Sequence, residues 1–301
     1  MQSSTRASWP AAAWITLVTL AVGCGRAPEP QQTTTGQPRI VSLSPAVSRT
    51  LLDFGLQQQI VGRSRWCASL DPAIPVLGDL YEINYEWLLR LDPTHVLLQP
   101  SASTGLDPTL ERLAAEHDWV LGHWTINTIA DIEQMVRDLP AVLFPGGGPG
   151  REAAAARAAD LLNRIDVAVT PHGADLWSGP TLLIADTEPV VLVFGRETYL
   201  NDILTGLGAQ NAIAARGWTE ISLEDILRMD PQAIILVRDR GPSQVSPLDA
   251  AGPLADLDTT ARREGRIAVL WHPDAKLPSS AVIGVAQQMR RVLAELSDSQ
   301  P

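Results

Sequence analysis

Two glutamates in equivalent settings, Glu86 and Glu224, are the first candidates for chemistry in this sequence. Each follows a residue that suits a helix N-cap, within a ten-residue pattern that ends in Asp-Pro and recurs 138 residues later, at 84–93 and 222–231. A carboxylate in the first turn of a helix is stabilised by the helix dipole, so capping alone explains either glutamate. Capping leaves unexplained why one chain carries the same short helix twice, and a pair of outward-facing carboxylates on two lobes can also contact a partner.

The usual catalytic and metal-binding patterns are missing from the sequence. It has no Gly-x-Ser-x-Gly elbow, no phosphate loop ending in Gly-Lys-Ser/Thr and no cysteine pair at metal spacing. The glycine-rich run at 146–150 lacks the lysine of a phosphate loop, and the five histidines have no paired spacing that would favour a free Zn²⁺ or Mn²⁺ site. The sequence therefore indicates a protein that is not an enzyme and has no resident cofactor.

Composition narrows the class further. The chain has 301 residues, 45% of them hydrophobic and 19% charged, which is enough for about two folded domains. With 23 basic and 34 acidic residues its net charge is −11. That balance argues against a nucleic-acid binder, which needs a basic surface.

The N-terminal segment has the order of a secretory signal. Arg6 precedes a 12-residue apolar stretch at 11–22, which is too short to span a bilayer comfortably, and small residues then lead to Cys24. This ending resembles a bacterial lipoprotein cleavage site, which predicts a signal peptide at 1–24 and a lipid on Cys24. The alternative is a soluble-export cleavage site beside an ordinary cysteine. Residues 25–38 have no apolar period and predict a flexible tether.

From Arg39 onward, short apolar runs alternate with amphipathic stretches, as in an α/β chain. The helix predicted at 151–169 is rich in alanine, contains no glycine or proline, and is a candidate connector between two α/β halves. Other helices are predicted at 47–54, 111–117, 130–139, 199–207 and 281–296, and strands at 39–43, 59–62, 96–98, 181–185, 190–194, 233–237 and 267–270.

The order of these pieces resembles a known family, the periplasmic substrate-binding proteins of ABC importers for cobalamin and ferric siderophores. The resemblance covers about residues 39–297. It consists of the segments at 39–45, 60–62 and 66–67, Gly78, the two ten-residue patterns, Gly195, 200–204, Gly208, Asn211 and Trp218. It implies two Rossmann-like three-layer α/β/α lobes joined by a long connecting helix. The corresponding boundaries are 39–148 for the N-terminal lobe, 149–170 for the connecting helix and 171–301 for the C-terminal lobe.

The resemblance implies a ligand held between the lobes by aromatic rings. Trp66 and Trp218 match positions at which cobalamin-binding members place rings against the corrin, while Trp87, Trp119, Trp124 and Trp177 are expected to be packing residues. Further candidate ligand contacts are Tyr81, Phe194, Tyr199, Trp271 and Arg196. Cys67 is interpreted as a small apolar loop residue, the alternative being a thiolate that ligates a metal centre in a bound macrocycle.

The implied function is capture of a corrinoid outside the cytoplasm and its delivery to a permease dimer with ATPase subunits. In such a family, one surface carboxylate per lobe docks onto permease arginines, which selects Glu224 and either Glu86 or Asp71 here. We expect a monomer, anchored through its lipid in the periplasm or at the cell surface. Because Arg63, Arg65 and Arg196 lie near the predicted gap, a ferric siderophore or haem stays open as the ligand. The alternative of another class is a structural or adhesive lipoprotein.

Overall fold

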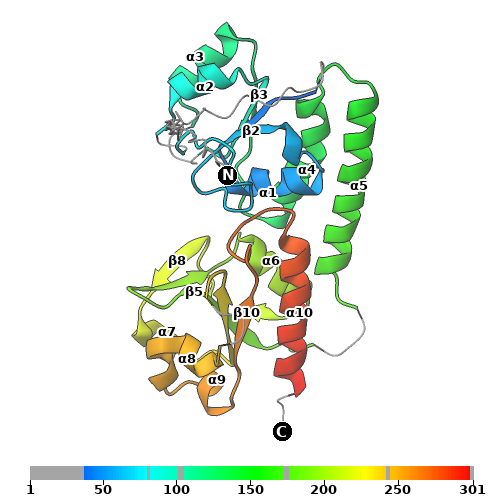
Figure 1. Ribbon diagram of the computed structural model, residues 1–301. Helices are drawn as coiled ribbons and strands as arrows, with labels where there is room; N and C mark the ends of the chain where they lie inside the picture. The colour runs from blue at the N-terminus through cyan, green and yellow to red at the C-terminus, as the bar shows by residue number, and fades with distance from the viewer. Residues whose placement is uncertain (1–36, 80–81, 101–104, 173–175, 242–244, 299–301) are drawn as a thin grey trace, which may run out of the picture. The chain divides into compact units, whose positions relative to one another are not determined.

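The computed structural model describes residues 37–79, 82–100, 105–172, 176–241 and 245–298. The predictions for the signal peptide, for Cys24, for nearly all of the tether and for Tyr81 lie outside these residues. Within them, the helices and strands form two α/β lobes, the first with a parallel sheet and the second with a mixed sheet (Figure 1).

The N-terminal lobe is built on a four-stranded parallel sheet with strand order β2-β1-β3-β4. Every residue of the two central strands is buried, as expected for a parallel sheet covered on both faces, whereas the edge strands are only partly buried. The strands are β1 (Ile40–Ser42), β2 (Ile60–Arg63), β3 (His95–Leu98) and β4 (Val120–His123). The helices are α1 (Pro45–Asp53), η1 (Gln57–Gln59), α2 (Tyr85–Leu91), α3 (Pro108–Glu116) and α4 (Ile129–Leu143).

A 21-residue helix, α5 (Pro149–Val169), leads from this lobe to the next. At 1.5 Å per residue it is about 30 Å long. Its buried side is a row of small and aliphatic residues, including Ala154, Ala158 and Leu161, and it lies beside α4 (Figure 1). The predicted connector is therefore present. It begins at Pro149, two residues before the alanine-rich run at 151–169, because proline is well suited to the first turn of a helix.

The C-terminal lobe has a mixed sheet with strand order β10-β9-β5-β6-β8. The strands β10, β9 and β5 are parallel, β6 is antiparallel to both β5 and β8, and β7 pairs with the start of β5. The strands are β5 (Pro180–Asp186), β6 (Val191–Phe194), β7 (Gln210–Asn211), β8 (Trp218–Ile221), β9 (Ala233–Arg238) and β10 (Ile267–Trp271). The helices are α6 (Tyr199–Gly206), α7 (Leu223–Met229), α8 (Pro247–Ala251), η2 (Gly252–Asp256), α9 (Thr260–Arg263) and α10 (Val282–Asp298).

Trp218 begins a strand that is absent from the strands predicted by the sequence. Trp218 opens strand β8, in register with Phe194 on β6. Along β8 the residues alternate between exposed and partly buried, so this four-residue edge strand has no apolar run that would identify it in the sequence. Its pairing with β6 gives it strand structure, and that is a contact between distant parts of the chain.

The sequence repeat is also a structural repeat. The helices α2 and α7 have the same length, and side-chain caps from Asn84 and Ser222 begin them. They end at Asp92 and Asp230, which both adopt the left-handed conformation, with φ of 43° and 45°. The predicted equivalence of residues 84–93 and 222–231 therefore extends to backbone geometry.

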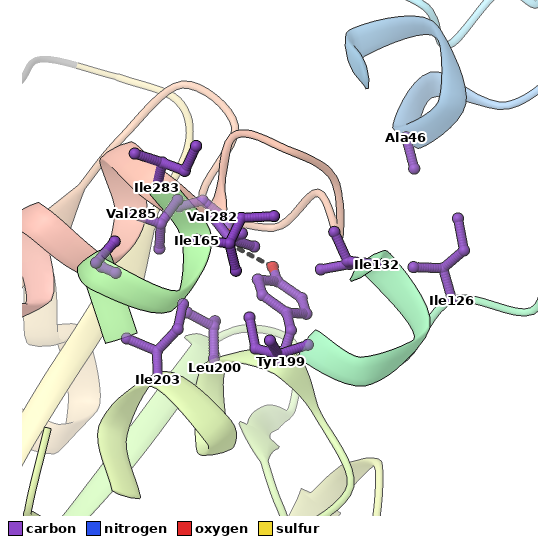
Figure 2. Close-up of a cluster of buried hydrophobic side chains, with 14 of the residues drawn as sticks. Ala46, Ile126, Ile132, Ile165, Tyr199, Leu200, Ile203, Val282, Ile283 and Val285 are labelled. Atoms are coloured by element: carbon purple, nitrogen blue, oxygen red, sulfur yellow. Dashed lines mark hydrogen bonds between the residues drawn. The ribbon is translucent and has the colours of Figure 1, made fainter. Parts of the chain in front are cut away.

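A shared hydrophobic core joins the two lobes. Tyr199 at the start of α6 is 1% exposed and belongs to one buried cluster with Ile132 of α4 and Val282 of α10 (Figure 2). Its hydroxyl donates a hydrogen bond to the carbonyl oxygen of Ala275. Because this cluster contains residues from helices of both lobes, the two lobes share one core where these helices pack together.

Polar contacts join the lobes at two further places. At the first, the Asp202 carboxylate of α6 accepts a 3.0 Å hydrogen bond from the amide of Ile129, the first residue of α4. At the second, Arg49 of α1 lies 3.2 Å from the Asp274 carboxylate, and the Ser280 hydroxyl donates to Asp53 at 2.6 Å. The first of these contacts sets the distance between the helix starts that border the site described below.

The buried side chain of His95 makes the stability of the N-terminal lobe sensitive to acid. Its Nε2 donates to the Val142 carbonyl at 3.1 Å and its Nδ1 lies 2.7 Å from the Thr94 hydroxyl, an arrangement that a neutral ring satisfies. Burial lowers the pKa of His95 below 6.5, although the bond to Val142 opposes the shift. Below about pH 6.5 the unfolded chain therefore binds a proton that the folded chain does not, and stability falls.

We expect His95→Gln to lose less stability than the wild type between pH 8 and pH 5. Glutamine keeps an N–H donor for Val142 but does not titrate, and one proton corresponds to at most about 1.4 kcal/mol per pH unit. Urea unfolding at both pH values measures the difference, which is at most about 2 kcal/mol for one group over the interval from pH 6.5 to pH 5. His123→Gln, at an exposed position, is the matched control. Equal acid losses in wild type and His95→Gln would contradict the assignment.

Candidate ligand-binding site

A pocket of about 490 Å³ lies where the starts of α4 and α6 meet, with walls from both lobes. Its lining residues are Asn127, Thr128 and Asp131 from the N-terminal lobe, and Glu197, Thr198, Arg216, Gly217 and Trp218 from the C-terminal lobe. Threonine N-caps begin both helices: Thr128 caps α4 and Thr198 caps α6. Since these helices follow β4 and β6, the pocket is positioned by the ends of two strands.

Trp218 forms an aromatic wall of this pocket and is held firmly from behind. Trp218 is 44% exposed, and the centroid of its ring lies 4.3 Å from that of buried Phe194. Gly195 allows the backbone to approach closely here, because a Cβ at that position would collide with the Ala215 carbonyl oxygen. The Gly195 amide donates to the Gly217 carbonyl at 2.8 Å. The tryptophan therefore offers one fixed apolar face.

Most polar groups that line the pocket already have partners within the protein. Thr128 and Asp131 form a capping box, and the Thr198 hydroxyl donates to the Gly195 carbonyl at 2.8 Å. Burial alone raises the pKa of Asp131, but hydrogen bonds from the amides of Thr128 and Asn127 outweigh it and hold that pKa below 3.8.

The charges on the opposite wall also compensate each other, because Glu197 and Arg216 form an ion pair of 3.1 Å. Of the lining side chains, two polar groups have no hydrogen-bond partner in the described part of the chain, the Asn127 carboxamide and the Trp218 indole N–H. The pocket thus combines an apolar ring, one ion pair, the hydrogen-bonded carboxylate of Asp131 and a neutral amide.

Trp66, the other predicted ring, lies in the N-terminal lobe in the loop after β2. It is 60% exposed and does not line the pocket that contains Trp218. The loop is fixed by hydrogen bonds, including one from the Trp66 amide to the Ser64 hydroxyl at 3.0 Å and one from Arg63 to the Ile74 carbonyl at 3.1 Å. The two tryptophans therefore come from different lobes, as predicted, with Trp66 on a separate exposed loop.

Cys67, next to Trp66, is fully buried. Its sulfur accepts a 3.1 Å hydrogen bond from Ser48, and burial raises the pKa of its thiol. A buried protonated thiol does not present a ligand for a metal. This arrangement agrees with the interpretation of Cys67 as a small apolar loop residue.

The remaining predicted contacts lie elsewhere. Phe194 and Tyr199 are 0% and 1% exposed, so both rings lie behind the pocket wall instead of on it, and we no longer assign them to the ligand. Trp271 is partly buried at the end of β10, and its indole N–H has no hydrogen-bond partner among the described residues. Arg196 is exposed, and it lines a different pocket, together with Asn201 and Asn211.

The predicted docking carboxylates are all exposed. Glu86 pairs with Arg90 on the same helix at 2.6 Å, whereas Glu224 has no ion pair or hydrogen bond in the described part of the chain. Asp71 accepts a hydrogen bond from the Ala73 amide at 2.8 Å within its own loop. The cap of α7 is closed by Asp225, so Glu224 is not needed for capping.

One packing expectation was wrong. Trp119, Trp124 and Trp177 are buried as predicted, but Trp87 is 39% exposed on α2. The guanidinium of Arg90 lies over its ring, 5.7 Å from the centroid. A seven-residue helix buries few of its side chains, and in α2 only Leu88 is fully buried.

Sequence reasoning missed most residues of the pocket. Asn127, Glu197 and Arg216 lie in connections between elements, and their types carry no distinctive pattern. The one usable signal was the Thr-x-x-Asp capping box at Thr128 and Asp131, which places a helix start directly after β4. The opposite wall could not be found in this way, because its approach to Asn127 is a contact between distant segments.

No cluster of three or more metal-ligating side chains occurs in the described ranges. Among the same residues, no helix combines the length and apolar character needed to cross a bilayer.

Comparison with known proteins gives a family-level match. The sequence profile of a family described as periplasmic binding protein matches residues 40–251. An uncharacterized ABC transporter substrate-binding lipoprotein of Bacillus subtilis (strain 168), YvrC, is 23% identical over 202 residues, which are 65% of this chain and 62% of that protein. The match thus spans less than two thirds of the relative's length.

Solved structures with the same fold include proteins that bind different ligands. The periplasmic heme-binding protein RhuT from Roseiflexus sp. RS-1 matches with a TM-score of 0.66 and 20% identity, over 88% of this chain and all of that one. The periplasmic vitamin B12 binding protein BtuF of Vibrio cholerae matches with a TM-score of 0.63 and 16% identity, over 86% of this chain and 98% of that one. At this identity the likeness concerns the fold.

Proposed function

This chain belongs to the periplasmic binding protein family, and we propose that it is the substrate-binding component of an ABC importer for a corrinoid such as cobalamin. The observation that carries the proposal is the Trp218 ring, exposed on one face in the pocket between the lobes and fixed from behind by Phe194. A flat macrocycle gains apolar burial and stacking from such a ring. Trp66 on the other lobe is proposed as a second contact surface.

The charges around the pocket favour a ligand without strong negative charge. Arg216 is paired with Glu197, and Arg65 lies 3.3 Å from Asp79 and 3.6 Å from Glu82. An anionic ferric chelate is typically held by clustered unpaired arginines. Arg65 and Arg216 are thus compensated, which supports a neutral or weakly charged ligand. Arg63 donates only to backbone carbonyls, and Arg196 has no ion pair in the described residues, so these two arginines keep an anionic chelate as the alternative.

The same pocket lacks the groups that usually hold haem iron. Its described lining contains no histidine, tyrosine, methionine or cysteine to serve as an axial ligand. This lining favours a corrinoid over haem. Haem and ferric siderophores are the alternatives that the ligand titration must distinguish from a corrinoid.

We expect Trp218→Ala to weaken cobalamin binding by about 1–3 kcal/mol, because the substitution removes a well-packed aromatic contact. The measurement is calorimetric titration of the purified protein with cobalamin, with tryptophan fluorescence quenching as a second readout. Trp87→Ala is the matched control, since Trp87 is similarly exposed but lies on α2 outside the pocket.

If the wild type binds haem or a ferric siderophore but neither cobalamin nor cobinamide, that ligand replaces the corrinoid in the proposed function. Unchanged cobalamin affinity in Trp218→Ala would remove this ring from the site.

We also propose that the protein acts outside the cytoplasm as a monomer held at the membrane by a lipid on Cys24. The sequence before Cys24 supports this, because it resembles a lipoprotein signal. More than one acyl chain is needed for stable attachment.

Delivery is proposed to occur by docking of α2 and α7 onto the permease dimer. The two helices expose Glu86 and Glu224 at equivalent positions, and each exposes a leucine one turn later, Leu89 and Leu227, which are 40% and 43% exposed. The two carboxylates differ in their ion pairs. Arg90 forms an ion pair with Glu86, whereas the equivalent Arg228 pairs with Asp225 at 2.9 Å and leaves Glu224 without one in the described residues. Glu224 can thus bind a basic group of a partner directly, whereas Glu86 must first break its ion pair with Arg90.

We expect Glu224→Gln to reduce ligand uptake several-fold, Glu86→Gln to reduce it less, and neither to change ligand affinity. Ion pairs at an exposed rim contribute mainly to encounter rate and orientation, so added salt should weaken docking while binding of the ligand persists. Uptake by cells or proteoliposomes containing the importer, alongside titrations of each purified variant, measures both effects.

Asp71→Asn tests the other carboxylate of the N-terminal lobe, and Glu111→Gln, in the first turn of α3, is the control outside the repeat. If capping were the only role of these glutamates, each substitution would cost at most about 1 kcal/mol of stability and leave uptake unchanged. Full uptake by the double variant Glu86→Gln/Glu224→Gln would exclude docking through this pair.

A further inference from the structure

We propose that Asn127 determines specificity by hydrogen bonding a peripheral carboxamide of the ligand, so that the pocket prefers amide-bearing to carboxylate-bearing macrocycles. This inference rests on the proposed function and adds a residue and a chemical preference to it. Asn127 is an exposed residue that lines the pocket on the wall formed by the N-terminal lobe, whereas Trp218 comes from the other lobe.

The backbone of Asn127 is fixed from both sides. Its amide donates to the Asp131 carboxylate at 3.0 Å, and its carbonyl accepts from the Tyr199 amide at 2.6 Å, across the junction of the lobes. Neither bond involves the side chain. The position of the residue is therefore determined by main-chain contacts, and its carboxamide is left available.

The other polar side chains of the pocket are engaged within the protein. Thr128 and Asp131 cap α4, Thr198 bonds to Gly195, and Glu197 pairs with Arg216. The Asn127 carboxamide and the Trp218 indole N–H are the lining groups that have no partner in the described residues. A carboxamide offers both a donor and an acceptor, which complements another primary amide in either orientation.

The charge of the pocket disfavours a carboxylate at the same place. The lining contains two carboxylates, Asp131 and Glu197, and one guanidinium, Arg216. Hydrogen bonds keep the pKa of Asp131 low, so its charge persists at neutral pH. A ligand carboxylate beside Asn127 would add a third negative charge near a single positive one.

The test compares two corrinoid probes, cobinamide, which carries primary carboxamides on its periphery, and cobyrinic acid, which carries the corresponding carboxylic acids. Dissociation constants at pH 7 are measured for the wild type, Asn127→Asp and Asn127→Ala. Asn127→Asp keeps the size and both main-chain bonds, and places a charge where the amide was. Asn163→Asp on the exposed side of α5 is the control with the same change in net charge.

We expect Asn127→Asp to weaken the binding of cobyrinic acid at least about fivefold more than the binding of cobinamide. The reason is that two carboxylates about 4 Å apart repel each other even in a site exposed to water. Asn127→Ala should weaken cobinamide by about two- to tenfold, the range for one lost hydrogen bond. Asn163→Asp should leave both constants unchanged.

Equal effects of Asn127→Asp on the two probes would overturn the assignment of Asn127, since a purely structural asparagine affects both ligands alike. Binding of neither probe to the wild type would overturn the proposed function and this inference together. The two failures are distinguishable, because in the first case the wild type still binds cobinamide.

Discussion

The arrangement of the site depends on a direct contact between two helix starts. Asp202 in the first turn of α6 accepts a hydrogen bond from the first amide of α4, and the adjacent carbonyl of Asn127 accepts one from Tyr199. A carboxylate at the N-terminus of a helix is stabilised by otherwise unpaired amides and by the helix dipole. Because each helix belongs to a different lobe, this local stabilisation also fixes the spacing of the pocket walls.

The aromatic wall is supported by a chain of contacts that ends at the same junction. Trp218 packs on Phe194, Phe194 meets Tyr199 edge-on at 6.4 Å, and the Tyr199 hydroxyl bonds to Ala275. Ala275 lies in the segment whose Asp274 reaches Arg49 of the N-terminal lobe. The orientation of an exposed ring is therefore linked to buried contacts that hold the lobes together, which favours a pocket formed before the ligand arrives.

Features with local causes were predictable from the sequence. The connecting helix follows from its alanine-rich run, and α2 and α7 follow from caps, prolines and a repeat that is visible in residue types alone. The pocket was not predictable to the same degree. Trp218 was predicted as a ligand contact, which stays a prediction, but it was not predicted as part of β8. Phe194 and Tyr199 were also predicted as contacts, yet both rings are buried, because burial is set by segments far away in the sequence. Asn127 and Arg216 could not be identified as pocket residues from the sequence, because such common polar residues come to line a pocket only through their position in the fold.

The shared core also has a consequence for the order in which the chain folds. One buried cluster contains Ala46 near the beginning of the described fold and Val282 and Leu296 in its last helix. The N-terminal lobe of a growing chain can form its sheet but cannot complete this core until α10 has been synthesised, and such distant contacts slow folding. A chain that cannot complete its core until its last helix has been synthesised stays unfolded for longer. This property suits a protein that is exported across a membrane before it folds.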